Sequence, residues 1–210
     1  MRNKTKKVAI IGGTGRMGSW FAKFFRDKGF HVIISGRKPK KTKTVASELK
    51  VDFTCSILDA VSESDIVVFA TPIGVTSKVI REAIKNAKKG AILFDIASIK
   101  GDIVKTLRKI QPFGVRTFSL HPMFGHGAQS INGKKLLLIP TGADLKEIQT
   151  VTRLFEEDGA IINIVPNAET HDKMVALTLS LTHFINLLFV SFLTAKNIVE
   201  LKKFGGTTFP

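Results

Sequence analysis

The residues best suited to chemistry are five consecutive positions, His121-Pro122-Met123-Phe124-Gly125. A histidine fixed by a following proline, with a glycine nearby that allows close packing, can exchange a proton with a bound hydroxyl near neutral pH. The same pattern also occurs in turns where a hydrogen-bonded histidine has only a structural role. Which interpretation applies depends on the elements that position this segment.

A glycine-rich loop near the N-terminus is a second candidate site. It fits the pattern G-x-G-x-x-G with Gly13, Thr14, Gly15, Arg16, Met17 and Gly18. An apolar stretch at residues 8–11 predicts a buried strand before the loop, and apolar residues at helical spacing in 17–25 predict a helix after it. Glycines in this setting let the backbone approach a pyrophosphate, which the helix N-terminus stabilises. We therefore predict dinucleotide binding rather than a merely structural turn.

The end of the second predicted strand, residues 31–35, bears on which dinucleotide binds. An NAD site usually presents Asp or Glu about 20 residues beyond the loop to bind the ribose 2′-hydroxyl. This chain has Ser35, Arg37 and Lys38 there instead. Ser35 can donate to a 2′-phosphate, Arg37 can pair with it and cover the adenine, and Lys38 adds charge. We predict a preference for NADP, with NAD as the other dinucleotide and a basic turn without ligand as the alternative.

Apolar strands and amphipathic helices alternate along the rest of the chain. The predicted strands are 8–11, 31–35, 66–70, 91–95, 115–120, 135–139 and 160–164, and the predicted helices after the first are 41–49, 75–86, 101–109 and 145–157. This alternation favours an α/β fold with a Rossmann-type, doubly wound, mainly parallel sheet. We assign residues 1–165 to an NADP-binding domain. His121 would follow a strand where substrate meets cofactor.

Two further segments follow predicted strands at the edge where parallel sheets bind ligands. Thr71 and Pro72 come after strand 66–70, and Ser98 comes after strand 91–95. Ser98 can hydrogen-bond a substrate oxygen, or it can cap the helix that begins near Gly101. The residues leave both roles open.

A long apolar helix is predicted after Asn167, a suitable N-cap. Polar residues interrupt its apolar pattern at Ser180, Thr182, His183, Asn186 and Ser191. A membrane span would need an uninterrupted run of about 20 apolar residues. We therefore expect a helix buried by another subunit or by a segment beyond Pro210, and a homodimer formed through it. Residues 166–210 would open an all-α C-terminal substrate and dimerisation domain.

Asp172 and His183 are expected to share one face of this helix, because their spacing is close to three full turns. Asn186 lies near the same face. These residues can shape a substrate pocket, or they can satisfy one another in an interhelical network. His171 points about a third of a turn away and is expected to be a structural histidine.

The composition indicates a basic protein of a reducing compartment. The chain has 210 residues, a formal net charge of +15 and one cysteine, Cys55. Its lysines are scattered without an aromatic stripe, which favours a solvated surface serving anionic small molecules over a nucleic-acid site. A single cysteine excludes an internal disulfide, and no apolar signal segment follows the basic start. We expect a cytoplasmic protein with no metal site and no membrane or nucleic-acid partner.

The ordered set of motifs resembles the prephenate dehydrogenase family, enzymes that oxidatively decarboxylate prephenate in tyrosine biosynthesis. The matching segments are the glycine loop and residues 70–72, 98–100, 121–125, 169–172 and 182–184. The resemblance implies that His121 takes the proton of the prephenate 4-hydroxyl as hydride leaves for the nicotinamide, and that Ser98 orients this histidine and the substrate. It also implies substrate-pocket roles for His183, His171 and Asp172.

The resemblance also implies an arginine, on a helix following the long one, that holds a substrate carboxylate. This chain ends before any candidate, so we expect a fragment of a longer enzyme that lacks full activity alone. Three alternative functions stay open. The substrate can be arogenate, the chain can be another NADP-linked dehydrogenase or reductase of the same architecture, or it can be a non-catalytic NADP-binding sensor. A 3-hydroxyacid dehydrogenase is disfavoured, because Lys173 is followed four residues later by Leu177 instead of an asparagine.

Overall fold

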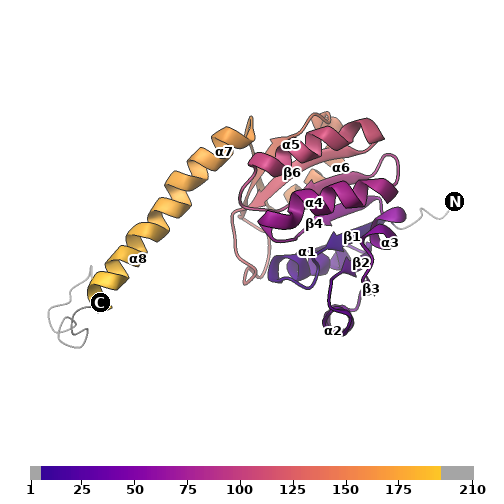
Figure 1. Cartoon of the computed structure of the whole chain (residues 1–210), viewed down its shortest axis with the longest axis horizontal. Coiled ribbons are helices and arrows are strands. Elements are labelled where there is room, and N and C mark those ends of the chain that lie inside the picture. Colours follow the sequence, from indigo (N-terminus) through magenta and orange to yellow (C-terminus); the bar gives the residue numbers. More distant parts are fainter. Residues whose placement is uncertain (1–5, 195–210) are drawn as a thin grey trace. The chain divides into compact units, whose positions relative to one another are not determined.

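The computed structural model describes residues 6–194, and the chain divides into two compact units, Met1–Glu169 and Thr170–Pro210. The first unit carries an eight-stranded sheet in the order β3-β2-β1-β4-β5-β6-β7-β8 (Figure 1). The strands are β1 (Lys7–Ile11), β2 (His31–Ser35), β3 (Asp52–Thr54), β4 (Ile66–Phe69), β5 (Ile92–Asp95), β6 (Arg116–Pro122), β7 (Lys135–Pro140) and β8 (Ile161–Ile164).

Helices cover both faces of this sheet. They are α1 (Arg16–Asp27), α2 (Pro39–Leu49), α3 (Ile57–Ser62), α4 (Ile73–Ala83), α5 (Gly101–Ile110) and α6 (Leu145–Glu157), with 3-10 turns η1 (Ile84–Asn86) and η2 (Gln111–Phe113). Successive residues of a strand point to opposite faces. In β1, Val8 and Ile10 therefore join the apolar core under α1 and α6, while Ala9 and Ile11 join the core under α3, α4 and α5.

The strand order reverses beside β1, which pairs with β2 on one side and β4 on the other. Neighbouring strands pair in parallel except β6 and β7, which are antiparallel. Ligands of such sheets bind outside the carboxyl ends of the strands at this switch point. The Rossmann-type, mainly parallel sheet expected from the alternating pattern is confirmed.

Two elements escaped the sequence analysis, strand β3 and helix α3. β3 is short and mostly exposed, so no apolar run marks it. α3 is also short, although its start carries a recognisable cap: the Asp59 amide donates to Ser56 Oγ at 3.1 Å. Short elements of this kind depend on pairing with a neighbour more than on their own sequence pattern.

Strand β6 also differs from the expectation that it ends at Leu120. It continues through His121 to Pro122, because these residues pair with antiparallel β7, where Pro122 lies opposite Leu136. The expectation that His121 follows the strand is therefore wrong. The histidine belongs to the last part of a strand and is held by its backbone ladder.

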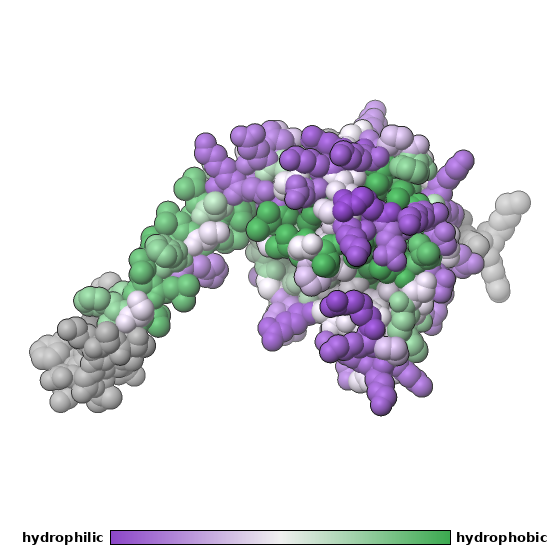
Figure 2. Space-filling view, viewed as in Figure 1, coloured by the Kyte–Doolittle hydropathy of each residue, from purple (hydrophilic) through white to green (hydrophobic). Residues whose placement is uncertain are grey.

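The described part of the second unit is one continuous helix. It consists of α7 (Ala168–Val175), a π-helical turn η3 (Ala176–Ser180) and α8 (Leu181–Thr194), and it begins directly after the predicted cap Asn167. Large apolar side chains are exposed along it (Figure 2). Residues 168–193 are long and apolar enough to cross a membrane by length and composition alone.

The π-helical turn changes which residues of this helix share a face. A π turn closes hydrogen bonds from residue i to i+5, so it holds one residue more than an α turn. The spacing from Asp172 to His183 crosses this turn, which leaves the two residues roughly a quarter of a turn apart. The expected shared face of Asp172 and His183 is therefore wrong, because it assumed an unbroken α-helix. His183 and Asn186 both follow the π turn and keep their relative position.

A surface ion pair at the amino end of β4 gives the fold a measurable pH dependence. Burial acts to raise the pKa of Asp65, but hydrogen bonds from Lys88 and the Lys7 amide, together with the charges of Lys88 and Lys6, outweigh it and lower the pKa. A carboxyl with a lowered pKa stabilises the fold above its unfolded-state pKa, and this contribution is lost as the pH falls through the folded-state pKa.

We expect Asp65→Asn to lower the free energy of unfolding by about 0.5–1 kcal/mol at pH 7, since a partly exposed pair contributes little. The difference from wild type should shrink as the pH falls through the folded-state pKa of Asp65, because the wild-type carboxyl then also becomes neutral. Urea unfolding over a series of pH values from 7 downward measures this. Glu48→Gln, an exposed carboxylate on α2, is the matched control, and an equal pH-dependent loss in that control would contradict the assignment to Asp65.

Candidate nucleotide site and catalytic edge

The glycine loop between β1 and α1 is packed so closely that side chains do not fit at several positions. A Cβ at Gly13 would lie 2.5 Å from the Cβ of Ile34, and one at Gly18 would overlap the carbonyl oxygen of Gly12. The amides of Gly12 and Gly13 donate to the Ser35 carbonyl at 2.9 and 3.1 Å. The last residue of β2 therefore holds the start of the loop by two backbone hydrogen bonds.

The start of α1 is suited to an anion. Its N-cap is Gly15, so no cap side chain accepts a hydrogen bond from the first amides of the helix. The first turn contains no acidic residue. The first amides of a helix have no acceptor within the helix and carry partial positive charge. A Cβ at Gly15 would lie 3.3 Å from the Gly12 oxygen, a tight contact but without the overlap found at Gly18. These residues fit a dinucleotide pyrophosphate.

A basic turn follows β2 beside this loop. Ser35 is only 3% exposed, whereas Arg37 and Lys38 are exposed to solvent. A Cβ at Gly36 would lie 2.8 Å from Thr14 Cγ2, so the turn and the glycine loop lie against each other. The guanidinium and ammonium groups are accessible to an anion at this edge, and the Ser35 side chain is far less accessible than they are.

The turn after β4 borders the glycine loop on its other side. A Cβ at Gly12 would lie 2.6 Å from the Ala70 carbonyl oxygen, which places the two backbones in contact. The hydroxyls of Thr71 and Thr76 are 2.8 Å apart, and Pro72 is the N-cap of α4. Thr71 and Pro72 therefore line the carboxyl edge of the sheet next to the loop, as the sequence suggested.

The two candidate catalytic residues lie at the carboxyl ends of neighbouring parallel strands. His121 is buried, with 6% exposure, near the end of β6. Ser98 is exposed in the turn between β5 and α5. The N-cap of α5 is Lys100, so Ser98 does not cap that helix. Of the two roles that the sequence left open for Ser98, the capping role is not supported, and contact with a substrate stays a prediction.

Sequence analysis missed a buried ion pair at this edge. Asp95 ends β5, and its Oδ2 lies 2.8 Å from Nζ of Lys100, with both side chains fully buried. A charged group is buried only at large cost unless it is paired. A charged residue at the end of a buried apolar strand, as Asp95 is, would have indicated a buried pair with a basic partner.

The comparisons with known proteins agree with this arrangement. A family model described as "Prephenate dehydrogenase, nucleotide-binding domain" matches residues 21–164. The chain belongs to the prephenate dehydrogenase family. The expected family resemblance is therefore confirmed, and the glycine loop lies just before the matched residues.

The curated relatives of this chain are longer than the chain itself. The "Probable arogenate/prephenate dehydrogenase" of Methanocaldococcus jannaschii is 34% identical, in an alignment that covers 100% of this chain and 48% of that relative. The T-protein of Haemophilus influenzae is 25% identical, covering 85% of this chain and 42% of the relative. The chain spans about half the length of these curated relatives.

Solved structures of the family share the fold. Prephenate dehydrogenase from Aquifex aeolicus is 26% identical with a TM-score of 0.76, covering 90% of this chain and 71% of that one. The arogenate dehydrogenase of Synechocystis has a TM-score of 0.78 at 19% identity, covering 97% of this chain and 76% of that one. At that identity the second likeness supports the fold alone.

Three residues that the family resemblance assigned to the substrate pocket belong to the second unit. His171 is buried, and its Nδ1 lies 2.8 Å from Asp172 Oδ1, a partnered state that also suits a structural histidine. Asp172 is partly exposed, and His183 is exposed on α8. Within residues 6–194, no group of three or more His, Cys, Asp or Glu side chains is arranged to hold a metal ion.

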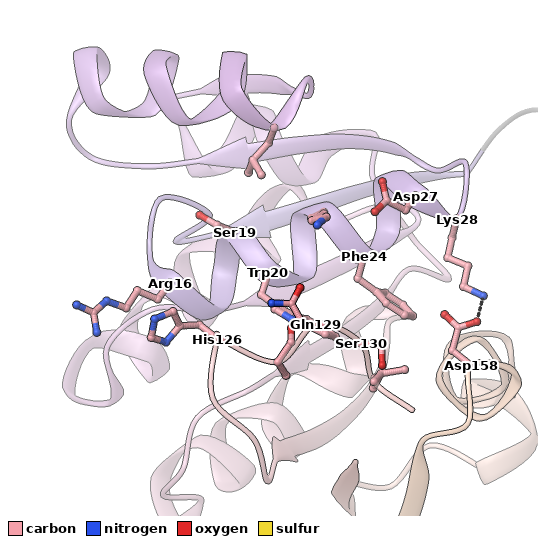
Figure 3. Close-up of a pocket in the computed structure, with 15 residues that line it drawn as sticks. Arg16, Ser19, Trp20, Phe24, Asp27, Lys28, His126, Gln129, Ser130 and Asp158 are labelled. Atoms are coloured by element: carbon pink, nitrogen blue, oxygen red, sulfur yellow. Dashed lines mark hydrogen bonds and ion pairs between the residues drawn. The ribbon is translucent and has the colours of Figure 1, made fainter. Parts of the chain in front are cut away.

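A cavity of about 640 Å³ lies between α1 and the loop that joins β6 to β7 (Figure 3). Trp20 anchors its wall: the indole Nε1 donates to the Ala128 carbonyl at 2.8 Å, and the ring packs on Phe124 with centroids 4.9 Å apart. Arg16 and His126 lie together at one end of the cavity. Arg16 of the glycine loop lines this cavity, and Phe124 of the His121 segment packs on Trp20 of its wall.

Proposed function

We propose that this chain is the NADP-binding, catalytic part of an enzyme that converts prephenate to 4-hydroxyphenylpyruvate. The observation that carries the proposal is the position of His121, at the carboxyl edge of the sheet that also bears the glycine loop. Family membership supports the reaction class. The relatives include both prephenate and arogenate dehydrogenases, so the choice of prephenate as the substrate is a further part of the proposal.

In the proposed reaction, His121 accepts the proton of the substrate 4-hydroxyl while hydride leaves the same carbon. Bound NADP supplies the hydride acceptor. The carbonyl then takes up the electron pair of the bond to the ring carboxylate, carbon dioxide leaves, and the ring becomes an aromatic phenolate. Its oxygen takes back a proton to give the 4-hydroxyl of the product. Ser98, exposed in the turn after β5, would hydrogen-bond the substrate oxygen and keep it directed toward His121.

Assays on the full-length protein test this function. Prephenate and arogenate are each supplied with NADP and with NAD, and reduced cofactor is followed by absorbance at 340 nm. Turnover of prephenate with NADP is the expected result, and turnover of arogenate alone would correct the substrate. Cofactor binding without turnover of either would instead support a non-catalytic NADP-binding sensor.

The preference for NADP rests on Arg37 and Lys38, exposed where NAD sites carry a carboxylate. We expect Arg37→Ala to weaken NADP binding about 10-fold or more, since a charge-assisted hydrogen bond contributes about 1.5–3 kcal/mol. NAD binding should change little. Fluorescence titration measures both, with Lys40→Ala on α2 as the control, and equal losses for NADP and NAD would contradict a 2′-phosphate contact.

We also propose that residues 1–165 form the NADP-binding domain, and that 166–210 open a helical domain that forms a homodimer. The exposed apolar side chains of α7, η3 and α8 support this, because patches of this size usually mark interfaces. Cys55, a free exposed thiol, supports a reducing compartment such as the cytoplasm. Light scattering on the full-length protein is expected to give a dimer, and a monomer would contradict the interface.

A further inference from the structure

The buried pair of Asp95 and Lys100 is connected to both candidate catalytic residues through the backbone. Asp95 Oδ2 accepts from Lys100 Nζ at 2.8 Å and from the Ala97 amide at 2.9 Å. The two ends of the six-residue segment Asp95–Lys100, which carries Ser98, are thereby joined to each other. Lys100 Nζ also donates to the carbonyl oxygen of Leu120 at 2.8 Å. Leu120 is the residue before His121.

The Lys100 contact comes where the sheet stops supporting β6 on one side. The ladder between β5 and β6 ends at the pair Asp95 and Ser119, whereas β6 and β7 stay paired as far as Pro122 and Leu136. Beyond Ser119, the Leu120 carbonyl accepts from a side-chain ammonium group. Ser119 itself donates through Oγ to Asp95 Oδ1. The end of β6 is thus held by β7 on one side and by this charged network on the other.

Stability alone does not account for a charged pair at this position. Two charges lose their hydration when they are fully buried, and well-packed apolar side chains of similar volume often stabilise a fold as well or better. Salt bridges and hydrogen bonds are directional, however, and fix the relative position of the segments that they join. A proton acceptor needs such fixing, because a displacement of about 1 Å can cost a reaction about 10²-fold.

We propose that Lys100 and Asp95 are positioning residues, which hold the Ser98 turn and the His121 backbone in the relative placement that the reaction needs. This inference rests on the proposed function. The pair acts through the Leu120 carbonyl and the Ala97 amide, without touching substrate. Ser119 is a lesser member of the same network, since its hydroxyl supports only one oxygen of Asp95.

The test removes both charges together in the full-length enzyme, because removing one would leave a buried charge unpaired. Asp95→Asn with Lys100→Met keeps the approximate volumes and loses the bond to Leu120. The expected result is a fall in kcat of about 10–100-fold, with the Kd for NADP and the Tm close to wild type. Lys105→Met, an exposed lysine on the same helix α5, is the control and should leave all three unchanged.

Two results would overturn the positioning role. One is an unchanged kcat in the paired variant. The other is a fall in kcat accompanied by weaker NADP binding and a lower Tm, because the variant would then be damaged as a whole. Should the paired variant not fold, Asp95→Asn with Lys100→Gln replaces it. Its two amide side chains can still hydrogen-bond to each other, although glutamine is shorter than lysine. This variant must also lower kcat without changing the Kd for NADP or the Tm. If neither pair folds, the network is needed for folding itself and the proposal fails.

A readout independent of turnover separates this proposal from the proposed function. The 1H–15N resonances of the His121 ring should shift in the paired variant and stay in place in Lys105→Met. If the wild-type enzyme uses neither prephenate nor arogenate, the proposed function fails while the resonances still report on positioning. If wild type is active and neither kcat nor the resonances respond to the paired substitution, only the positioning role fails.

Discussion

His121→Asn is expected to lower kcat for prephenate by about 10²-fold or more in the full-length enzyme, while NADP binding stays within about twofold of wild type. The asparagine keeps a polar side chain of similar size near the end of β6, where His121 is 6% exposed, so packing is largely retained. An amide cannot take up the hydroxyl proton, however, and the reaction loses its proton acceptor.

Steady-state kinetics and cofactor titration measure the two effects, and the pH profile of kcat/KM adds a third. The profile should lose its acidic limb in His121→Asn, since that limb reports the group that must be unprotonated before reaction. His31→Asn, an exposed histidine at the amino end of β2, is the matched control and should keep wild-type kcat. Wild-type turnover in His121→Asn would exclude this histidine as the proton acceptor.

The parts of the site that are formed by one continuous segment of the chain could be predicted from the sequence. The glycine loop is an example, because Gly13 and Gly18 leave no room for a Cβ and the pattern records that requirement directly. Strands β1 and β4, which end next to this loop, are buried on both faces, so they read as continuous apolar runs. Local constraints of this kind are visible without knowledge of the rest of the fold.

The parts that depend on contacts between distant segments were not predictable. The bond from Lys100 to the Leu120 carbonyl exists only because β5 and β6 are neighbours and β6 is the longer strand. Pairing with β7 likewise extends β6 through His121. The π turn in residues 176–180 has no mark in the apolar pattern, yet it moves His183 away from the face of Asp172.

Gly15→Ala and Gly18→Ala are expected to impair NADP binding for different physical reasons. At Gly18 the added Cβ would overlap the Gly12 carbonyl oxygen, which is backbone and cannot rotate away. We expect a loss of about 1–3 kcal/mol in the free energy of unfolding, as for other overpacked sites, together with loss of NADP binding. At Gly15 the added Cβ would lie 3.3 Å from the same oxygen, a tight contact that a small shift can relieve, so we expect the fold to lose about 1 kcal/mol.

Gly15→Ala should still weaken NADP binding about 10-fold or more, because its methyl group adds bulk at the N-cap of α1, where the pyrophosphate is proposed to approach the first amides. Urea unfolding and cofactor titration separate the two variants. Gly74→Ala in α4, where a Cβ meets nothing within 4 Å, is the control and should stabilise the fold by about 0.5–1 kcal/mol. Full NADP affinity in Gly15→Ala would mean that the pyrophosphate does not approach this helix start. Only the close packing of the loop would then support dinucleotide binding, and a turn that binds no ligand would explain that packing equally well.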